Sequence, residues 1–205
     1  MKIACIIMAS GLSQRFGSNK LLAQFNGKSL IEIILDKTND LCESMVAEDG
    51  CDIQFERLVL TRTKEVQMFC EARDIDVIFH ELPNRNDAVK LGVEHMKDCD
   101  GIVFCTCDQP LLKRDSIRRL IHEYQSKGVG IYRLAFDDKV GNPILFSKEY
   151  FGELCQLPPK KGGAFLATKH ADDVILVGAF DKWELYDVDT PDDIVILSRQ
   201  EGIRG

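Results

Sequence analysis

Short apolar runs rich in β-branched residues alternate with amphipathic stretches along most of this chain, and this alternation constrains the fold more than any other feature of the sequence. The runs expected to form strands are Ile3–Ala9, Arg57–Thr61, Asp76–Phe79 and Gly101–Thr106. The stretches with apolar residues at helical spacing are Ser29–Thr38, Lys64–Arg73, Ala88–Lys97 and Asp115–Lys127. Runs that are apolar throughout are typical of strands buried on both faces. The pattern predicts an α/β fold of three layers, with a mainly parallel central sheet covered by helices.

The last third of the chain is less regular. Its expected strands and helix are Gly130–Phe136, Pro143–Phe146, Val174–Val177 and Glu184–Val188, with a helix over Lys148–Cys155. A final helix is predicted from Thr190 to about Arg199, because Pro191 suits a first turn and acidic residues follow it. Residues 39–56 are acidic and weakly periodic, so we expect a loop insertion there, within a single domain of residues 1–205.

The charge balance excludes two classes of partner. With 26 Lys and Arg against 33 Asp and Glu, the net charge is −7, which argues against non-specific binding to nucleic acid or to an anionic membrane. No apolar run approaches the length of about 18–20 residues that a membrane span needs. The eight cysteines form no CxxC pair, which is typical of reduced, buried thiols. We therefore expect a cytoplasmic protein, and the charge balance leaves open a small anionic substrate held by a few local cations.

A turn rich in small residues follows the first predicted strand, with the sequence MASGLSQRFGSNK at residues 8–20. Small residues let backbone N–H groups approach a phosphate, and Arg15 and Lys20 add two positive charges. The spacing of Gly11 and Gly17 matches neither the Walker A loop nor the GxGxxG fingerprint. The turn predicts a phosphate-binding loop; the alternative is an ordinary turn between a strand and a helix that happens to be basic.

Acidic residues follow two further predicted strands. Asp108 belongs to the element CDQP at residues 107–110, which comes directly after GIVFCT, while Asp187 and Asp189 lie at the end of the last predicted strand. Carboxylate oxygens are preferred ligands of Mg²⁺. Asp108 and Asp189 are therefore candidates for a two-carboxylate Mg²⁺ site, although Asp108 could instead cap the next helix and Asp189 could only mark a helix start.

The sequence contains no nucleophile motif of the GxSxG type. Its four histidines are scattered without metal-ligand spacing: His80, His95, His122 and His170. The combination indicates recognition of an anion with the help of Mg²⁺, without covalent catalysis.

Taken together, these motifs resemble the MobA-like nucleotidyltransferases, which use a nucleoside triphosphate to attach a nucleoside monophosphate to a phosphorylated acceptor. The family's G-x-S-x-R-[MF]-G-x-x-K signature matches within Ala9–Lys20, its Asp-x-Pro matches Asp108–Pro110, and its D-x-D-T-P-x-D matches Asp187–Asp193. The matches cover almost the whole chain in the family's order. The resemblance implies a Rossmann-like nucleotidyltransferase fold.

Within that family the chain is most similar to the molybdenum cofactor cytidylyltransferases. The element CDQP at residues 107–110 and the stretch Gly141–Phe146 carry this likeness. It implies CTP as the donor and molybdopterin as the acceptor. Relatives that transfer a guanylyl group have two glycines in the first turn, whereas Ser10 keeps a Cβ there, which favours cytidine.

The resemblance also assigns residues. It implies that Arg15, Lys20 and Asp108 act in catalysis and that Asp108 and Asp189 bind Mg²⁺. The positions implied for nucleotide binding are Ala9, Ser10, Gly11, Arg15, Lys20, Arg85, Asp87 and Gly92, and those for acceptor binding are Asn142 and Lys161.

The chain departs from the family in the segments that recognise the base and the acceptor. Ala88 replaces a usual serine, Asn142 replaces a more usual histidine, and KKGGAF at residues 160–165 lacks the Asp and Arg of the common G-D-x-G-A-R stretch. Three alternatives therefore stay open. They are transfer from GTP, another acceptor such as a sugar or polyol phosphate, and a non-catalytic accessory protein that hands the cofactor to a molybdenum enzyme.

Overall fold

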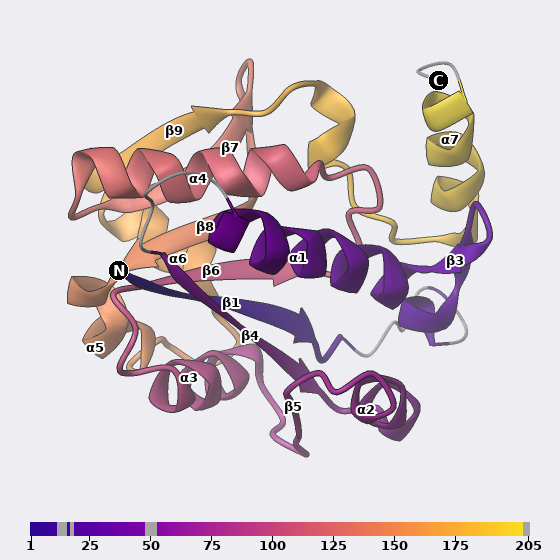
Figure 1. Cartoon of the computed structure of the whole chain (residues 1–205), viewed down its shortest axis with the longest axis horizontal. Coiled ribbons are helices and arrows are strands. Elements are labelled where there is room, and N and C mark those ends of the chain that lie inside the picture. Colours follow the sequence, from indigo (N-terminus) through magenta and orange to yellow (C-terminus); the bar gives the residue numbers. More distant parts are fainter. Residues whose placement is uncertain (12–15, 17–18, 48–52, 203–205) are drawn as a thin grey trace.

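The computed structural model describes residues 1–11, 16, 19–47 and 53–202, which form a central sheet with helices on both faces (Figure 1). In this part of the chain the sheet consists of β1 (Lys2–Ala9), β4 (Gln54–Thr61), β5 (Val77–Phe79), β6 (Gly101–Thr106), β7 (Ile131–Phe136), β8 (Lys139–Ser147) and β9 (Val174–Gly178). A separate small hairpin pairs β2 (Gln24–Phe25) with β3 (Lys28–Ser29).

The strands lie in the order β5-β4-β1-β6-β8-β7-β9. The first four are parallel, β8 runs antiparallel to both of its neighbours, and β7 and β9 are parallel to each other. The prediction of a mainly parallel sheet is thus confirmed. From β1 the chain proceeds to β4 and β5 on one side and then returns to β6 on the other, so the strand order reverses between β1 and β6. Open α/β sheets bind ligands at the carboxyl ends of their strands at such a point.

Two layers of helices cover the sheet (Figure 1). The helices are α1 (Leu30–Ala47), α2 (Lys64–Glu71), α3 (Arg85–His95), α4 (Arg114–Lys127), α5 (Phe151–Leu154), α6 (Gly163–Lys169) and α7 (Pro191–Gly202). On one face α1, α2 and α4 pack against Ile3, Cys5 and Ile7 of β1, and on the other α3, α5 and α6 pack with Ala4 and Ile6. All five side chains are fully buried, as the continuous apolar run predicts. No helix in the described ranges has the length and apolar character needed to cross a membrane.

The prediction of a loop insertion over residues 39–56 is wrong for most of that segment. Helix α1 continues to Ala47, and Leu41 is fully buried, so the apolar face of the helix extends past Thr38 despite the acidic residues around it. Strand β4 already begins at Gln54, which pairs with Lys2 at the start of β1. Residues 48–52 lie outside the described part of the chain.

A second correction concerns Glu184–Val188, which was expected to be a strand. Lys182–Leu185 instead forms a 3-10 helix that begins with a capping box of Asp181 and Glu184. The Glu184 carboxylate is fully buried and accepts hydrogen bonds from the Lys113 N–H at 2.9 Å and the Ser116 hydroxyl at 2.5 Å. This buried carboxylate fastens the segment to the start of α4, which explains why its alternating pattern does not lead to sheet pairing.

Candidate functional site

A cavity of about 720 Å³ opens at the carboxyl ends of β1, β4, β5 and β6. Its lining combines residues that follow these strands with residues of β8 and of the start of α6. The predicted site residues in the lining are Ser10, Gly11, Lys20, Arg85, Asp108, Asn142 and Asp189. The topology thus gathers residues from both ends of the sequence around one cavity.

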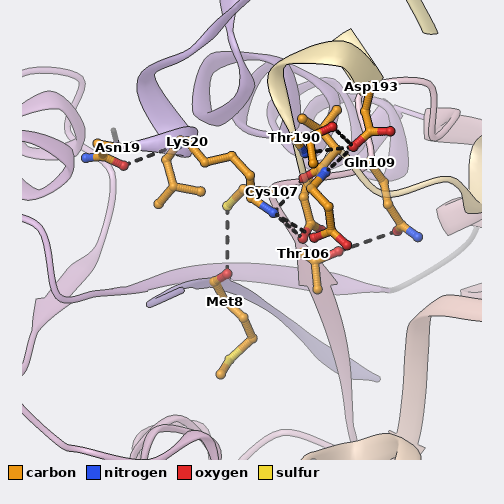
Figure 2. A network of polar contacts seen from close by, with 12 residues as sticks. Met8, Asn19, Lys20, Thr106, Cys107, Gln109, Thr190 and Asp193 are labelled. Atoms are coloured by element: carbon orange, nitrogen blue, oxygen red, sulfur yellow. Dashed lines mark hydrogen bonds and ion pairs between the residues drawn. The ribbon is translucent and has the colours of Figure 1, made fainter. Parts of the chain in front are cut away.

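Lys20 lies at the centre of a network of polar contacts (Figure 2). Its Nζ donates to Asp108 Oδ2 at 3.0 Å and to the Val188 carbonyl oxygen at 2.6 Å, and it lies 3.7 Å from Asp189 Oδ1. Asn19 caps the 3-10 helix Lys20–Leu22 by accepting from the Leu21 N–H at 3.2 Å. Only 12% of the Lys20 side chain is exposed, so its ammonium group is held in a low-dielectric place between two carboxylates.

Asp108 is held by its backbone as well as by Lys20. It lies two residues after the end of β6, and its carbonyl oxygen accepts from the Val188 N–H at 2.7 Å, which ties the β6 end to the segment before α7. Its second carboxylate oxygen, Oδ1, is buried without a hydrogen-bond partner among the described residues. A buried carboxylate oxygen without a partner is costly. The atom is therefore suited to bind a cation or to accept a hydrogen bond from a ligand in the cavity.

Asp189 is positioned by the start of α7, which begins at Pro191 as predicted. Asp193 in the first turn accepts from the Asp189 N–H at 3.0 Å, from the Thr190 N–H at 2.7 Å and from the Thr190 hydroxyl at 2.8 Å (Figure 2). These three bonds fix the backbone at Asp189. Asp189, the predicted Mg²⁺ ligand, thus both precedes a helix start and lines the cavity.

Asp187 adds a third acidic group beside this pair. Partial burial desolvates the Asp187 carboxyl, and the negative charges of Asp108 and Asp189 lie nearby. These effects together raise the pKa of Asp187 to about 6. Much of the residue still faces solvent, so water screens part of this effect. The concentration of negative charge favours a bound cation at this end of the cavity.

Two residues that the sequence reasoning missed line the same cavity. Arg62 follows β4 directly, and His80 follows β5 directly. Ser10 Oγ contacts His80 Nε2 at 2.8 Å, so the ends of β1 and β5 meet above β4. Both residues directly follow a predicted strand, a position that could have marked them as candidates, but only the structure shows that they share a cavity.

The wall opposite the ionic network comes from α3, β8 and the turn before α6. Arg85 at the start of α3 is exposed, and its side chain lies against Gly162, where a Cβ would come within 2.8 Å of Arg85 Cδ. Asn142 lies on β8, just before Ile144 and Phe146, which also line the cavity. This wall therefore offers one cation and one amide above an apolar floor.

Four predicted site residues do not line the cavity: Ala9, Asp87, Gly92 and Lys161. Ala9 is fully buried, and its carbonyl oxygen accepts from the Thr61 hydroxyl at 3.2 Å. Lys161 is exposed, with its Nζ 5.7 Å from the centre of the Phe165 ring. Arg15 lies outside the described residues, so its predicted role stays a prediction.

Asp87 and Gly92 have structural roles within α3. The Asp87 carboxylate accepts from the side-chain amides of Asn84 at 3.1 Å and Asn86 at 2.8 Å, which stabilises the first turn. A Cβ at Gly92 would come within 2.9 Å of the side chains of Ile6 and Leu60. Gly92 thus permits close packing of α3 on the sheet, and its predicted contact with nucleotide stays a prediction.

The thiol of Cys107 also borders the cavity. Burial strongly raises its pKa, and the adjacent Asp108 charge adds to the shift. Its Sγ lies 3.9 Å from the Met8 carbonyl oxygen (Figure 2). At neutral pH the group is a protonated, packed thiol, which makes it a poor nucleophile.

A family model described as the MobA-like NTP transferase domain matches residues 5–174. A curated relative from Geobacillus sp. (strain WCH70), named "Probable molybdenum cofactor guanylyltransferase", is 25% identical over 122 residues, which are 58% of this chain and 56% of the relative. The chain therefore spans little more than half the length of the curated relatives that it matches.

Two solved structures have the same fold over nearly their full length. The crystal structure of Rv0371c from Mycobacterium tuberculosis H37Rv has a TM-score of 0.80 at 25% identity. The match covers 97% of this chain and 99% of the Rv0371c chain. A nucleotidyl transferase from Methanothermobacter thermautotroptrophicus (Mth528) has a TM-score of 0.78 at 20% identity, with 99% of both chains covered. The predicted Rossmann-like nucleotidyltransferase fold is confirmed.

Proposed function

The chain belongs to the MobA-like NTP transferase family, and on that premise we propose that it transfers a nucleoside monophosphate from a nucleoside triphosphate to a phosphorylated acceptor. The observation that carries this proposal is the ammonium group of Lys20, held 3.0 Å from Asp108 and 3.7 Å from Asp189 inside the cavity. A fixed cation beside two carboxylates, at the switch point of a parallel sheet, suits a polyphosphate and its counter-ion.

In the proposed reaction an oxygen of the acceptor's phosphate attacks the α-phosphorus of the nucleotide in line. The bond from the α-phosphorus to the bridging oxygen breaks, and pyrophosphate leaves. Such transfers depend on positioning and charge stabilisation rather than on covalent work by the protein. Lys20 offsets the negative charge that grows on the leaving pyrophosphate. The backbone around Ser10 and Gly11, together with Arg15, is proposed to bind the phosphates.

A divalent cation, Mg²⁺ by preference, fits the residues present. Asp108 and Asp189 would hold it, because the buried Asp108 Oδ1 has no partner among the described residues and hard oxygen ligands suit this ion. When bound, it would supply charge neutralisation at the phosphates of both substrates. In the described ranges no three His, Cys, Asp or Glu side chains form a complete metal-binding group, so phosphate oxygens and water would supply the other ligands. A manganese complex of Rv0371c, with a TM-score of 0.74 at 22% identity and 97% and 99% of the two chains covered, is in keeping with this proposal.

For the nucleotide we propose CTP, with GTP as the second candidate. Ser10 supports CTP, because its Cβ occupies a position where guanylyl-transferring relatives have glycine. GTP is favoured by the name of the curated relative, a molybdenum cofactor guanylyltransferase. CTP and GTP would react in the same way, and they differ only in the base that the protein has to recognise.

For the acceptor we propose molybdopterin, on the strength of the family resemblance and the curated relative's name. Asn142, which the resemblance assigns to the acceptor, would meet it on the wall opposite Lys20. Arg85 lies on the same wall, and we propose that it contacts the acceptor as well as the nucleotide to which the resemblance assigns it. A sugar or polyol phosphate is the alternative acceptor. A molybdenum enzyme is the proposed client that receives the product. If the chain is instead a non-catalytic accessory protein, it would hand the cofactor to the same client.

Calorimetric titration of the protein with CTP, GTP and ATP, with and without Mg²⁺, tests this proposal. We expect tight binding of one nucleotide that depends on Mg²⁺, followed by pyrophosphate release when molybdopterin is added. Release with a sugar or polyol phosphate instead would change the acceptor but keep the reaction. Absence of nucleotide binding would contradict the proposal and favour the accessory protein.

A further inference from the structure

A second polar group lies near the cavity that holds the Lys20 network, and its histidine has no role in the reaction proposed above. It consists of Ser10, Leu60 and His80 at the ends of β1, β4 and β5. The His80 backbone N–H donates to the Thr61 carbonyl oxygen at 2.9 Å, which brings its ring over the end of β4. Only 7% of His80 is exposed, yet the residue lines the cavity.

The hydrogen bonds of this group determine where the imidazole proton lies. Ser10 Oγ lies 3.0 Å from the Leu60 carbonyl oxygen and 2.8 Å from His80 Nε2. A carbonyl oxygen can only accept, so the single hydroxyl proton of Ser10 must point to Leu60. Both contacts can then be hydrogen bonds only if His80 Nε2 carries a proton and donates it to Ser10 Oγ.

This arrangement leaves His80 Nδ1 as a buried acceptor. The atom has no hydrogen-bond partner within the described ranges. Burial lowers the pKa of His80, and the positive charge of Arg62 lowers it further, so both effects favour the neutral ring. A neutral ring protonated on Nε2 has a lone pair on Nδ1, and that lone pair calls for a donor from a ligand.

The position of His80 favours the nucleobase as this ligand group. Phosphate oxygens accept hydrogen bonds, whereas cytosine, adenine and guanine each carry an exocyclic amino group that donates. Leu82, Pro83 and Val89 line the cavity on the β5 and α3 side and present apolar surface. A flat base packs well against such a wall, whereas a ribose would place its hydroxyl groups there without partners.

We propose that His80, oriented by Ser10, is the acceptor that recognises an exocyclic amino group of the nucleobase. The inference rests on the proposed function in one respect, because it requires that the cavity binds a nucleoside triphosphate. Ser10 is then a positioning residue: its hydroxyl sets the tautomer of His80, and its own contact with the base is not needed.

The test compares nucleotides that differ at the amino group. CTP is paired with UTP, while GTP and ATP are each paired with ITP, which lacks the amino group of either. Binding of each pair is measured with the wild type, His80→Gln and His80→Asn. A Gln amide nitrogen reaches the place of Nε2 and keeps a donor to Ser10, whereas an Asn amide oxygen takes the place of Nδ1 and keeps an acceptor.

We expect the wild type to bind the amino nucleotide of one pair about tenfold more tightly than its partner, the effect of about one buried hydrogen bond. In His80→Gln that ratio should fall towards one, and in His80→Asn most of it should remain. A merely structural role for His80 would weaken both members of the pair alike and leave the ratio unchanged, which would overturn the proposal.

A nitrogen-15 NMR spectrum of the histidine-labelled protein keeps the inference testable if a His80 variant does not fold. We expect a protonated Nε2 and an unprotonated Nδ1 at neutral pH, and a mixture of tautomers in Ser10→Ala. The opposite tautomer in the wild type would overturn the inference. Nucleotide binding without discrimination within any pair would refute this inference alone, whereas the absence of all nucleotide binding would refute the proposed function as well.

Discussion

The two walls of the cavity differ in how firmly their polar groups are held. On the β1 and β6 side, Lys20, Asp108 and Asp189 are tied to one another and to the backbone. On the opposite wall Arg85 is exposed and rests against Gly162, with no hydrogen bond to its guanidinium among the described residues. Fixed charges such as those around Lys20 suit the attack on the α-phosphate, which is the same for every acceptor. A less firmly held cation such as Arg85 can contact acceptors of different shape. The sequence departs from its family on this second wall, as the difference would lead one to expect.

The largest effect is expected when the fixed cation is removed. In Lys20→Ala we expect the rate of pyrophosphate release to fall by about a hundred- to a thousandfold, the cost of losing one preorganised charge in a dry site. Lys28→Ala is the matched control, because Lys28 is also paired with an acid, Asp36 at 2.6 Å, but is exposed. Comparable rates in the two variants would show that Lys20 is not part of the proposed chemistry.

Replacing each of the two acids should reduce activity by an amount that depends on how buried its carboxylate is. For Asp108→Asn we expect a loss of activity of about a hundredfold and a weaker response to added Mg²⁺ or Mn²⁺. For Asp189→Asn the expected loss is smaller, about tenfold, because 43% of its side chain is exposed against 25% for Asp108 and solvent screens its charge. Titration of activity against metal concentration measures both, and the reverse order would contradict the assignment.

On the opposite wall, Gly162→Ala tests whether the position of Arg85 matters. The new Cβ would lie 2.8 Å from Arg85 Cδ, so the side chain has to move. We expect KM for the acceptor to rise about fivefold, corresponding to about 1 kcal/mol of steric cost, with little change in kcat. Gly152→Ala serves as control, since its Cβ would have open space around it. Equal KM values in the two variants would mean that the acceptor does not use Arg85.

Gly92→Ala sharpens the distinction between site and support. Its Cβ would crowd Ile6 and Leu60 at 2.9 Å, while alanine favours the helix more than glycine does. We expect these effects to leave a net loss of about 1 kcal/mol in the free energy of unfolding, measured in urea, with KM for nucleotide unchanged. A raised KM at full stability would support the prediction that Gly92 contacts the nucleotide.

The smallest effect is expected for Lys161→Ala. Lys161 is exposed and does not line the cavity, so its removal should change the kinetics by no more than about twofold. Steady-state assays over a range of acceptor concentrations measure this. An increase of tenfold or more in KM for the acceptor would support the acceptor-binding role that the family resemblance implies.

From the sequence alone, the buried strands and the principal charged residues of the site could be predicted. Hydrophobic periodicity marks β1 and β6 because strands buried on both faces must be apolar, and Lys20, Asp108 and Asp189 follow from their places after predicted strands or before a helix. The same periodicity failed at residues 39–47, where acids obscure the buried Leu41. Local patterns report the average burial of a segment, so elements with mixed faces are the ones they miss.

Other features were decided only by tertiary structure. A buried glutamate, Glu184, turns an apparent strand into a 3-10 helix that is fastened to α4, and Gly92 faces the sheet rather than the cavity. The sequence places His80 directly after a strand, but only the structure brings it against Ser10 and leaves its Nδ1 without a partner among the described residues. The physical reason is that spacing along the chain determines which residues end a strand. Packing of distant segments determines which of those residues share a cavity and which polar atoms are left there without a partner.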